Sequence, residues 1–287
     1  MLSSLAGVLF DGFAYGMLLF LLSVGLSVTL GMMNFVNLAH CSFAMVGGYT
    51  TVTLVNKLGW PFLASLPAAF VTAALLSIVF ERVLFRRLYK ATDLDQCLLT
   101  IGVVFISIAA FAWFYTTEQQ SARVPAWLLG SVHVGGLSFA HYRIFLIVVS
   151  LAITAMLIFL LERTRFGAQV RAAVDNQRMA RGLGIDVDRA FMITFALGGG
   201  LAGLGGALSI QVVGLDPTFA LTFLVYVLIV VSVGGLGSIG GSFAAAVVLG
   251  ISDMAGKYYF PWLGAFLIYL VMVGLLMWRP VGLFGKR

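Results

Sequence analysis

The sequence predicts an all-α protein, a polytopic transmembrane helical bundle of about eight or nine spans, with the N-terminus outside and the C-terminus cytoplasmic. Three observations lead to this prediction. Of the 287 residues, 61% are hydrophobic and only 10% are charged, and the mean hydropathy is +1.07, whereas soluble domains are about half apolar and a quarter charged. Apolar runs recur along the whole chain, and the basic residues gather in alternate loops.

Nine apolar runs are candidate spans, because about 20 apolar residues cross the hydrocarbon core of a bilayer. They cover residues 5–30, 35–55, 61–84, 97–115, 143–161, 190–212, 222–236, 242–256 and 263–278. The seventh and eighth runs are short, and only a few residues, three of them glycine, separate them. These two runs are either two crossings or a pair of re-entrant half-helices, so eight spans is the alternative to nine.

The basic residues predict the orientation, because cytoplasmic loops are enriched in Lys and Arg. With the N-terminus outside, 13 of the 17 basic residues fall on the inner side. These are Arg82, Arg86, Arg87, Lys90, Arg163, Arg165, Arg171, Arg178, Arg181, Arg189, Arg279, Lys286 and Arg287. Their placement in separate loops argues against a nucleic-acid partner, despite the net charge of +6.

Two loops are long enough to have a structure of their own within what we expect to be a single domain, residues 1–287. Residues 116–142 are predicted to lie outside and residues 162–189 in the cytoplasm. The cytoplasmic loop carries helix formers from Gln169 to Arg181, and Gly182 and Gly184 follow as a stop signal. One short amphipathic helix under the membrane is the expectation, and a solvated basic connector is the alternative.

Four polar residues fall in or beside the second apolar run: Asn34, Asn37, His40 and Ser42. Polar groups in hydrocarbon are costly, so they usually face the interior of a bundle or a wet cavity. Asn37 and His40 are three residues apart and are expected to share a helical face. They either line a solute pathway or make hydrogen bonds that only fix helix packing.

Two glycine patterns have a packing interpretation. Gly235, Gly237 and Gly240 match GxGxxG, but no βαβ unit surrounds them, so a tight membrane turn is favoured over a dinucleotide site. Gly199 with Gly203, and Ala202 with Gly206, follow the spacing of closely packed membrane helices. That packing is either internal or against a second subunit.

Signatures of catalysis are missing from the sequence. It contains no GxxxxGK[ST] loop, no HExxH motif and no nucleophile elbow. The chain is therefore not expected to be an enzyme, and no cofactor or metal is expected.

Several stretches, in order, resemble the permeases of the branched-chain amino acid (Liv-type) ABC importers, in particular the shorter, H-type inner-membrane subunit. They are LGMMNFVNLAHCSFAMVGGY (30–49), ERVLFRRL (81–88), RTRFGAQVRAAVDNQRMARGLGIDVDRAFMITFALGGGLAGLGGAL (163–208), VGGLGSIGGSFAAAVVLG (233–250) and RPVGLFG (279–285). Many relatives read NFAHG where this chain has Asn37, Leu38, Ala39, His40 and Cys41. That departure leaves the solute open.

The resemblance implies an importer subunit in the bacterial inner membrane that works by alternating access. Its partners would be a second homologous permease, two cytoplasmic ATP-binding cassette ATPases and a periplasmic solute-binding protein. It also implies that the cytoplasmic loop couples to the ATPases, through Arg171, Ala172, Ala180, Gly182, Gly184, Ile185 and Asp186. Branched-chain or related amino acids lead as solutes; urea, short amides and aromatic acids are alternatives. An ion-coupled secondary transporter remains a different possibility.

Overall fold

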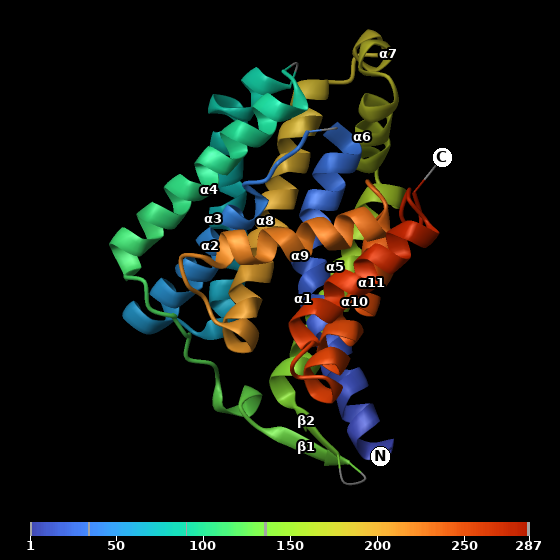
Figure 1. Ribbon diagram of the computed structural model, residues 1–287. Coiled ribbons are helices and arrows are strands. Elements are labelled where there is room, and N and C mark those ends of the chain that lie inside the picture. The colour runs from blue at the N-terminus through green and yellow to red at the C-terminus, as the bar shows by residue number, and fades with distance from the viewer. Residues whose placement is uncertain (1, 34, 90, 135–136, 286–287) are drawn as a thin grey trace.

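The computed structural model describes residues 2–33, 35–89, 91–134 and 137–285, and it is almost entirely helical (Figure 1). The first half contains α1 (Leu2–Met33), α2 (His40–Val52), the π-helical turn η1 (Thr53–Lys57), α3 (Phe62–Val83), the 3-10 turn η2 (Phe85–Leu88), α4 (Asp93–Tyr115) and η3 (Ala126–Leu128). After strands β1 (Ser131–Val134) and β2 (Leu137–Ala140) come α5 (His141–Arg163), α6 (Arg165–Asp175), α7 (Gln177–Gly182), α8 (Val187–Val213), α9 (Phe219–Gly234), α10 (Ile239–Tyr259) and α11 (Gly264–Trp278).

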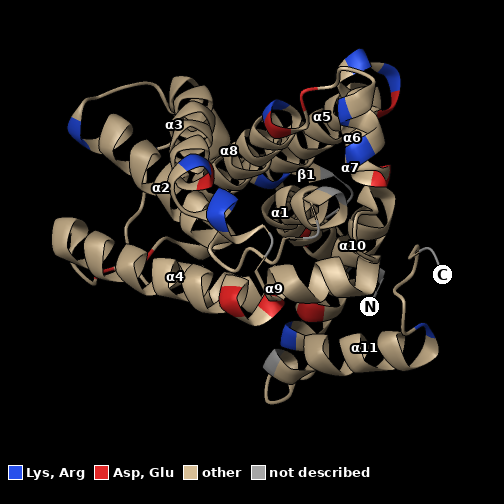
Figure 2. Cartoon of the chain, turned by 90° about the horizontal axis from the view of Figure 1, so that it is seen from above, with Lys and Arg blue, Asp and Glu red and all other residues tan. Residues whose placement is uncertain are grey.

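Helix α1 forms the centre of the bundle. Its 32 residues extend about 48 Å at 1.5 Å per residue, and its middle is fully buried from Met17 to Leu22. Helices α8 and α10 make its most extensive contacts, and α5 and α9 also pack on it. Seen along the bundle, α1 is end-on among these helices, while α4 and α11 lie at the edge (Figure 2).

Among the described residues, six helices are long and apolar enough to cross a membrane: α1, α3, α4, α5, α8 and α10. Helices α2, α9 and α11 have 13, 16 and 15 residues, so each extends only about 20–24 Å, less than the roughly 30 Å core of a bilayer. The prediction of eight or nine full spans is therefore not confirmed. Of the two runs considered as half-helices, only α9 is short, and it lies across the bundle (Figure 1).

A short β-hairpin is the exception to the all-α prediction. Strands β1 and β2 pair antiparallel, with Ser131 opposite Ala140. The sequence does contain a signal for it, since Val132 and Val134 alternate with polar residues before Gly135 and Gly136. The hairpin lies near the start of α1, and we call this end of the molecule the hairpin end (Figure 1). The opposite end, which carries α6 and α7, is the α7 end.

The glycine-rich segment between α9 and α10 is a tight turn, as predicted. Gly235 and Gly237 have φ of 94° and 77°, which favours glycine. A Cβ at Gly237 would meet the backbone of Gly31 in α1, and one at Gly235 would meet that of Gly285. The C-terminal segment returns here, since the Leu283 N–H donates to the Val233 carbonyl at 2.7 Å. Close backbone contact, rather than phosphate binding, explains these glycines.

Candidate functional site

A non-helical segment interrupts the bundle between α1 and α2. Within it Phe35, Asn37 and Ala39 are buried. The segment ends at His40, whose Nε2–H donates to the Leu22 carbonyl at 3.1 Å. Leu22 lies eleven residues before the end of α1, about 16 Å along its axis. The chain therefore returns deep into the bundle before α2 begins.

The polar backbone of this segment has to be satisfied internally, because no water is available at membrane depth. The Val36 N–H donates to Oε1 of Gln96, on α4, at 3.0 Å. The amide Nε2 of Gln96 in turn donates to the Leu88 carbonyl at 3.2 Å. Gln96 is only 3% exposed. Sequence reasoning missed it because it stands one residue before the predicted span 97–115.

The described polar side chains of the break and of the first turn of α2 are buried. Among the residues that the structure describes, both amide atoms of Asn37 and the Oγ of Ser42 lack a hydrogen-bond partner, although His40 has one. An unpaired buried polar group costs about 1–3 kcal/mol, and most such groups in proteins are paired. Asn37 and Ser42 therefore place polar groups with unused hydrogen-bonding capacity inside the bundle, among the described residues.

The structure brings Asn37, His40 and Ser42 together but corrects how they are arranged. Helix α2 begins at His40 and not near residue 35, so Asn37 and His40 do not share a helical face. A backbone hydrogen bond joins them instead, from the His40 N–H to the Asn37 carbonyl, at 3.4 Å. The chain can stay non-helical here because Oε1 of Gln96 accepts the Val36 N–H, which a backbone carbonyl would accept in a helix. Asn34 lies outside the described residues.

The loop 162–189 forms two helices, α6 and α7, and not the single helix that was predicted. The chain breaks at Asn176, whose Oδ1 accepts the Met179 N–H at 2.9 Å and so caps α7. Thr164 caps α6 in the same way, through the Gly167 N–H at 3.3 Å. A side-chain cap inside a run of helix formers gives this loop its angled shape.

The two helices rest on a small apolar cluster separate from the main core. Its buried members are Ala173, Ala180, Val187 and Phe191, and Met33, Tyr89 and Ile185 pack against it. Ala180 is thus an anchor of α7.

The other predicted coupling residues surround this anchor. Ile185 donates its N–H to the Ala180 carbonyl at 3.0 Å, and Gly182 ends α7. Gly184 has φ of 80°, which favours glycine, and Asp186 caps α8 by accepting the Arg189 N–H at 2.9 Å.

Two more of these residues lie on α6. Arg171 donates to the Leu161 carbonyl, and Ala172 is half-buried beside it. All seven predicted coupling residues therefore belong to α6, α7 and the turn that leads into α8.

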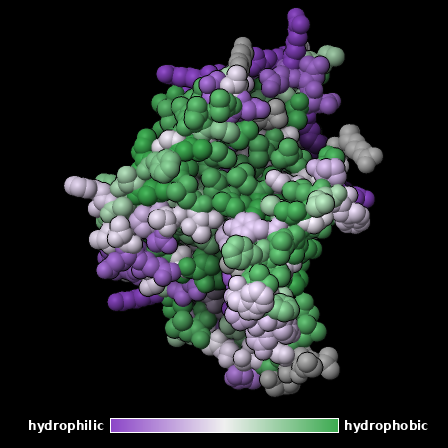
Figure 3. Space-filling model, in the orientation of Figure 1, coloured by the Kyte–Doolittle hydropathy of each residue, from purple (hydrophilic) through white to green (hydrophobic). Residues whose placement is uncertain are grey.

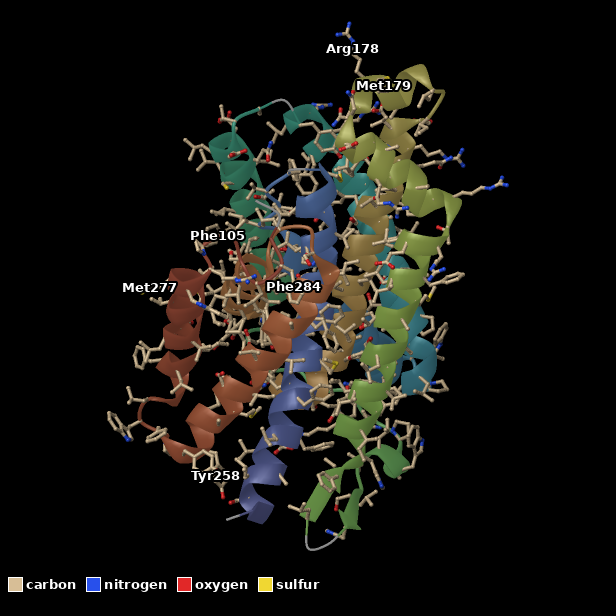
Figure 4. All side chains as sticks on the ribbon, turned by 90° about the vertical axis from the view of Figure 1, so that its right-hand side faces the viewer. Phe105, Arg178, Met179, Tyr258, Met277 and Phe284 are labelled. Atoms are coloured by element: carbon tan, nitrogen blue, oxygen red, sulfur yellow. The ribbon has the colours of Figure 1, made fainter. Side chains whose placement is uncertain are left out.

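Two apolar side chains point away from this anchor. Met179 is 65% exposed and Leu183 is 76% exposed. Met179 and Arg178 stand at the tip of the molecule (Figure 4). The tip of α7 therefore offers an apolar surface beside basic side chains, while the opposite face of the loop is fixed to the bundle.

Asp188 links this loop to the connection between α3 and α4. It pairs with Arg181 of α7 at 2.9 Å and with Arg86 of η2. All three side chains are about half exposed, so each pair contributes little to stability alone. Together the two pairs fix the position of α7 relative to η2, because both use the Asp188 carboxylate.

Charge is distributed unevenly between the two ends. Nine arginines from the ends of α3, α5 and α8, with η2, α6 and α7, lie at the α7 end. The hairpin end has Lys57, Arg123, Arg143 and Lys257. Figure 3 shows hydrophilic residues around the α7 end and a broad hydrophobic surface below them. Among the described residues, no cluster of His, Cys, Asp or Glu is arranged to hold a metal.

The sequence matches known proteins over most of its length. Residues 8–276 match the sequence profile of the family described as the branched-chain amino acid transport system permease component. The chain is 27% identical to a probable branched-chain amino acid transport permease protein LivH of Methanocaldococcus jannaschii, over 94% of this chain and 90% of the relative. It is 25% identical to the high-affinity permease protein BraD of Pseudomonas aeruginosa, over 97% and 95%.

A match over a smaller share of the relative is that to the permease protein LivM of Escherichia coli, 26% identical over 93% of this chain and 68% of that protein. No solved structure matches the chain.

Proposed function

The chain belongs to the family of branched-chain amino acid transport permease components, and from this premise we propose that it is one membrane subunit of an ATP-binding cassette importer. The family, together with the six apolar helices among the described residues, supports a multi-pass membrane permease. In the proposal, the solute is a branched-chain or related amino acid, and the membrane is the bacterial inner membrane. The chain itself carries out no covalent chemistry.

The α7 tip is the observation on which this proposal rests. A helix pair that projects from a membrane bundle, anchored by Ala180 and exposing Met179 and Leu183, suits docking to a separate soluble motor. The motor would be a pair of ATPases that bind at the α7 end. Docking can drive transport only if the α7 contacts differ between two states of the transporter.

The break between α1 and α2 is the proposed pathway element. Discontinuous helices near the membrane midplane are typical of solute sites in transporters, because unwound backbone and helix ends offer polar groups there. Asn37, His40 and Ser42 supply such groups beside α1. The amide of Asn37, whose two polar atoms have no partner within the described part of the chain, is the strongest candidate for contact with a solute.

A second permease subunit is part of the proposal. Similarity both to LivH-type and to LivM-type permease proteins supports a pair of related subunits. A periplasmic binding protein would deliver the solute at the hairpin end. We place the dimer contact on no particular helix, because the small residues of α8 pack within this chain.

The docking proposal is tested with the complete transporter in proteoliposomes. Met179→Glu and Leu183→Glu should each abolish co-purification of the ATPases and ATP-driven leucine uptake, because a buried unpaired charge would replace an apolar contact. Leu129→Glu is the matched control for ATPase co-purification, since Leu129 is 70% exposed but lies near the hairpin, at the other end of the molecule. ATPase binding that survives both α7 substitutions would refute the docking surface, and uptake driven by an ion gradient alone would refute the importer.

A further inference from the structure

The short connection between α3 and α4, residues 84–89, contacts both parts of the candidate site. On the α7 side, Arg86 pairs with Asp188, the carboxylate that also binds Arg181 of α7. On the interior side, the Leu88 carbonyl accepts a hydrogen bond from Gln96, whose other amide atom binds Val36 in the break. We call residues 84–89 the connecting loop.

Aromatic packing joins the same two regions through the connecting loop. The ring of Tyr89 lies 6.3 Å from that of Phe191, in the cluster beneath α6 and α7. It lies 5.7 Å from the ring of Phe35, the first described residue of the break. The ring of Phe85 is 5.4 Å from Phe35 as well. Centroid distances of this size are direct ring contacts.

These contacts are stiff enough to pass on a displacement. Packed interiors have low compressibility and transmit strain. The Gln96 amide is planar and uses both of its ends, one on the connecting loop and one on the break. If the loop moved without the break, a buried donor or acceptor would lose its partner. Such a loss is more costly than a concerted shift of the segment.

We propose that the connecting loop transmits movement of α6 and α7 to the interior break, with Gln96 as the positioning residue beside Asn37. This inference rests on the proposed function, which places the motor at α7 and the pathway at the break. Two links define the route. Asp188 forms the link on the α7 side, and Gln96 forms the link on the break side.

A double-mutant cycle in the reconstituted transporter tests the route. Gln96→Leu keeps the side-chain size and removes both amide contacts, and Asp188→Ala removes both ion pairs. Each single variant should lower the amount of solute transported per ATP hydrolysed by about two- to tenfold, the range of one net hydrogen bond. The double variant should be no worse than the poorer single variant, because both changes interrupt one route.

Controls separate this route from a purely structural role. Gln211→Leu removes a comparable bond from an amide to a carbonyl, that to Ala122, near the hairpin end, and should leave the transport ratio unchanged. Arg86→Ala, at a side chain that is 44% exposed, interrupts the route without a core change. It should lower the ratio even if Gln96→Leu fails to fold.

The possible results also distinguish failure of the route from failure of the proposed function. Additive effects, or a normal ratio in Gln96→Leu or Arg86→Ala, would overturn the route while ATP-driven uptake by the unaltered protein still stood. If the unaltered protein shows no ATP-driven uptake, the proposed function is wrong and the route is refuted with it. Retained ATPase co-purification in every variant would show that the changes act on transmission and not on docking.

Discussion

Glu81 is a carboxylate in the last turn of α3 with only 2% of its side chain exposed. One of its oxygens accepts a hydrogen bond from the Tyr89 hydroxyl at 2.7 Å, and the other lies 3.7 Å from Nε of Arg82. Burial, followed by the bond to Glu81, raises the pKa of Tyr89 above its ordinary value. The phenol therefore stays protonated and keeps donating to the carboxylate.

We expect Tyr89→Phe to destabilise the protein by about 1–3 kcal/mol, because it leaves a buried carboxylate oxygen without its donor. The ring contacts with Phe35 and Phe191 would remain. The thermal midpoint of the detergent-solubilised protein measures the effect. Tyr258→Phe, at an exposed tyrosine, should leave that midpoint unchanged. Equal midpoints for the two variants would mean that the hydroxyl contributes nothing.

At the scale of single residues, the sequence could identify Asn37, His40 and Ser42 because each is polar within an apolar run. It could not identify Gln96, which stands at the edge of a span and resembles an ordinary loop residue. The role of Gln96 depends on Val36, 60 positions away in sequence. No local pattern encodes a contact of that range.

At the scale of elements, α2 and α8 pack with backbone close to backbone. A Cβ at Gly206 would meet the backbone of Ala44, and one at Gly47 would meet that of Gly203. The spacing of small residues in α8 predicted close packing, either within the chain or against a second subunit. In the structure the packing lies within the chain. Gly199, Gly203 and Gly206 all face helices of this chain. The spacing of small residues in one helix does not show which helix packs against it.

We expect Gly206→Ala to destabilise the protein by about 1–3 kcal/mol, because α2 and α8 would have to move apart in a packed core. Gly102→Ala is the matched control in α4, where an added Cβ meets nothing within 4 Å. That control should be neutral or stabilising by up to about 1 kcal/mol, since Ala favours a helix over Gly. Thermal unfolding of both variants measures the difference, and similar losses would argue against the close contact.

The division between α6 and α7 shows a second limit at this scale. Helix formers run from Gln169 to Arg181, so periodicity favours one helix. The Asn176 side chain competes by capping the Met179 N–H, as Asn often does at helix starts. Two short helices let both Ala173 and Ala180 pack on the small cluster, and this packing favours the internal cap over one continuous helix. The sequence of the loop does not reveal that cluster.

At the scale of the whole molecule, hydropathy located the apolar segments well but did not show that two of the predicted spans contain non-helical residues. The predicted span 35–55 includes the buried non-helical residues before His40, and the predicted span 222–236 includes Gly235, in the turn after α9. Hydropathy depends on the side chains, and a buried non-helical segment can carry side chains as apolar as those of a helix. A hydropathy profile therefore cannot tell a short helix with a buried break from a full crossing.

The charge difference between the two ends makes a prediction about the whole molecule. Nine arginines at the α7 end, against four basic residues at the hairpin end, predict that the α7 end is cytoplasmic. Single cysteines at Arg178 and Ser131, both exposed, report on the two ends once Cys41 and Cys97 have been replaced by alanine.

In intact cells, a membrane-impermeant maleimide should label Ser131→Cys, whereas Arg178→Cys should react only after the membrane is permeabilised. The reverse pattern would place α7 outside, where no ATP is available, and so would contradict both the orientation and the proposed docking of ATPases. Damage to the membrane would let the maleimide label both sites in intact cells. A cytoplasmic protein expressed in the same cells is the control, because it stays unlabelled as long as the membrane is intact. Orientation is therefore the measurement on which the assignment of the two ends depends, because the ATPases are proposed to bind at one end and the solute-binding protein at the other.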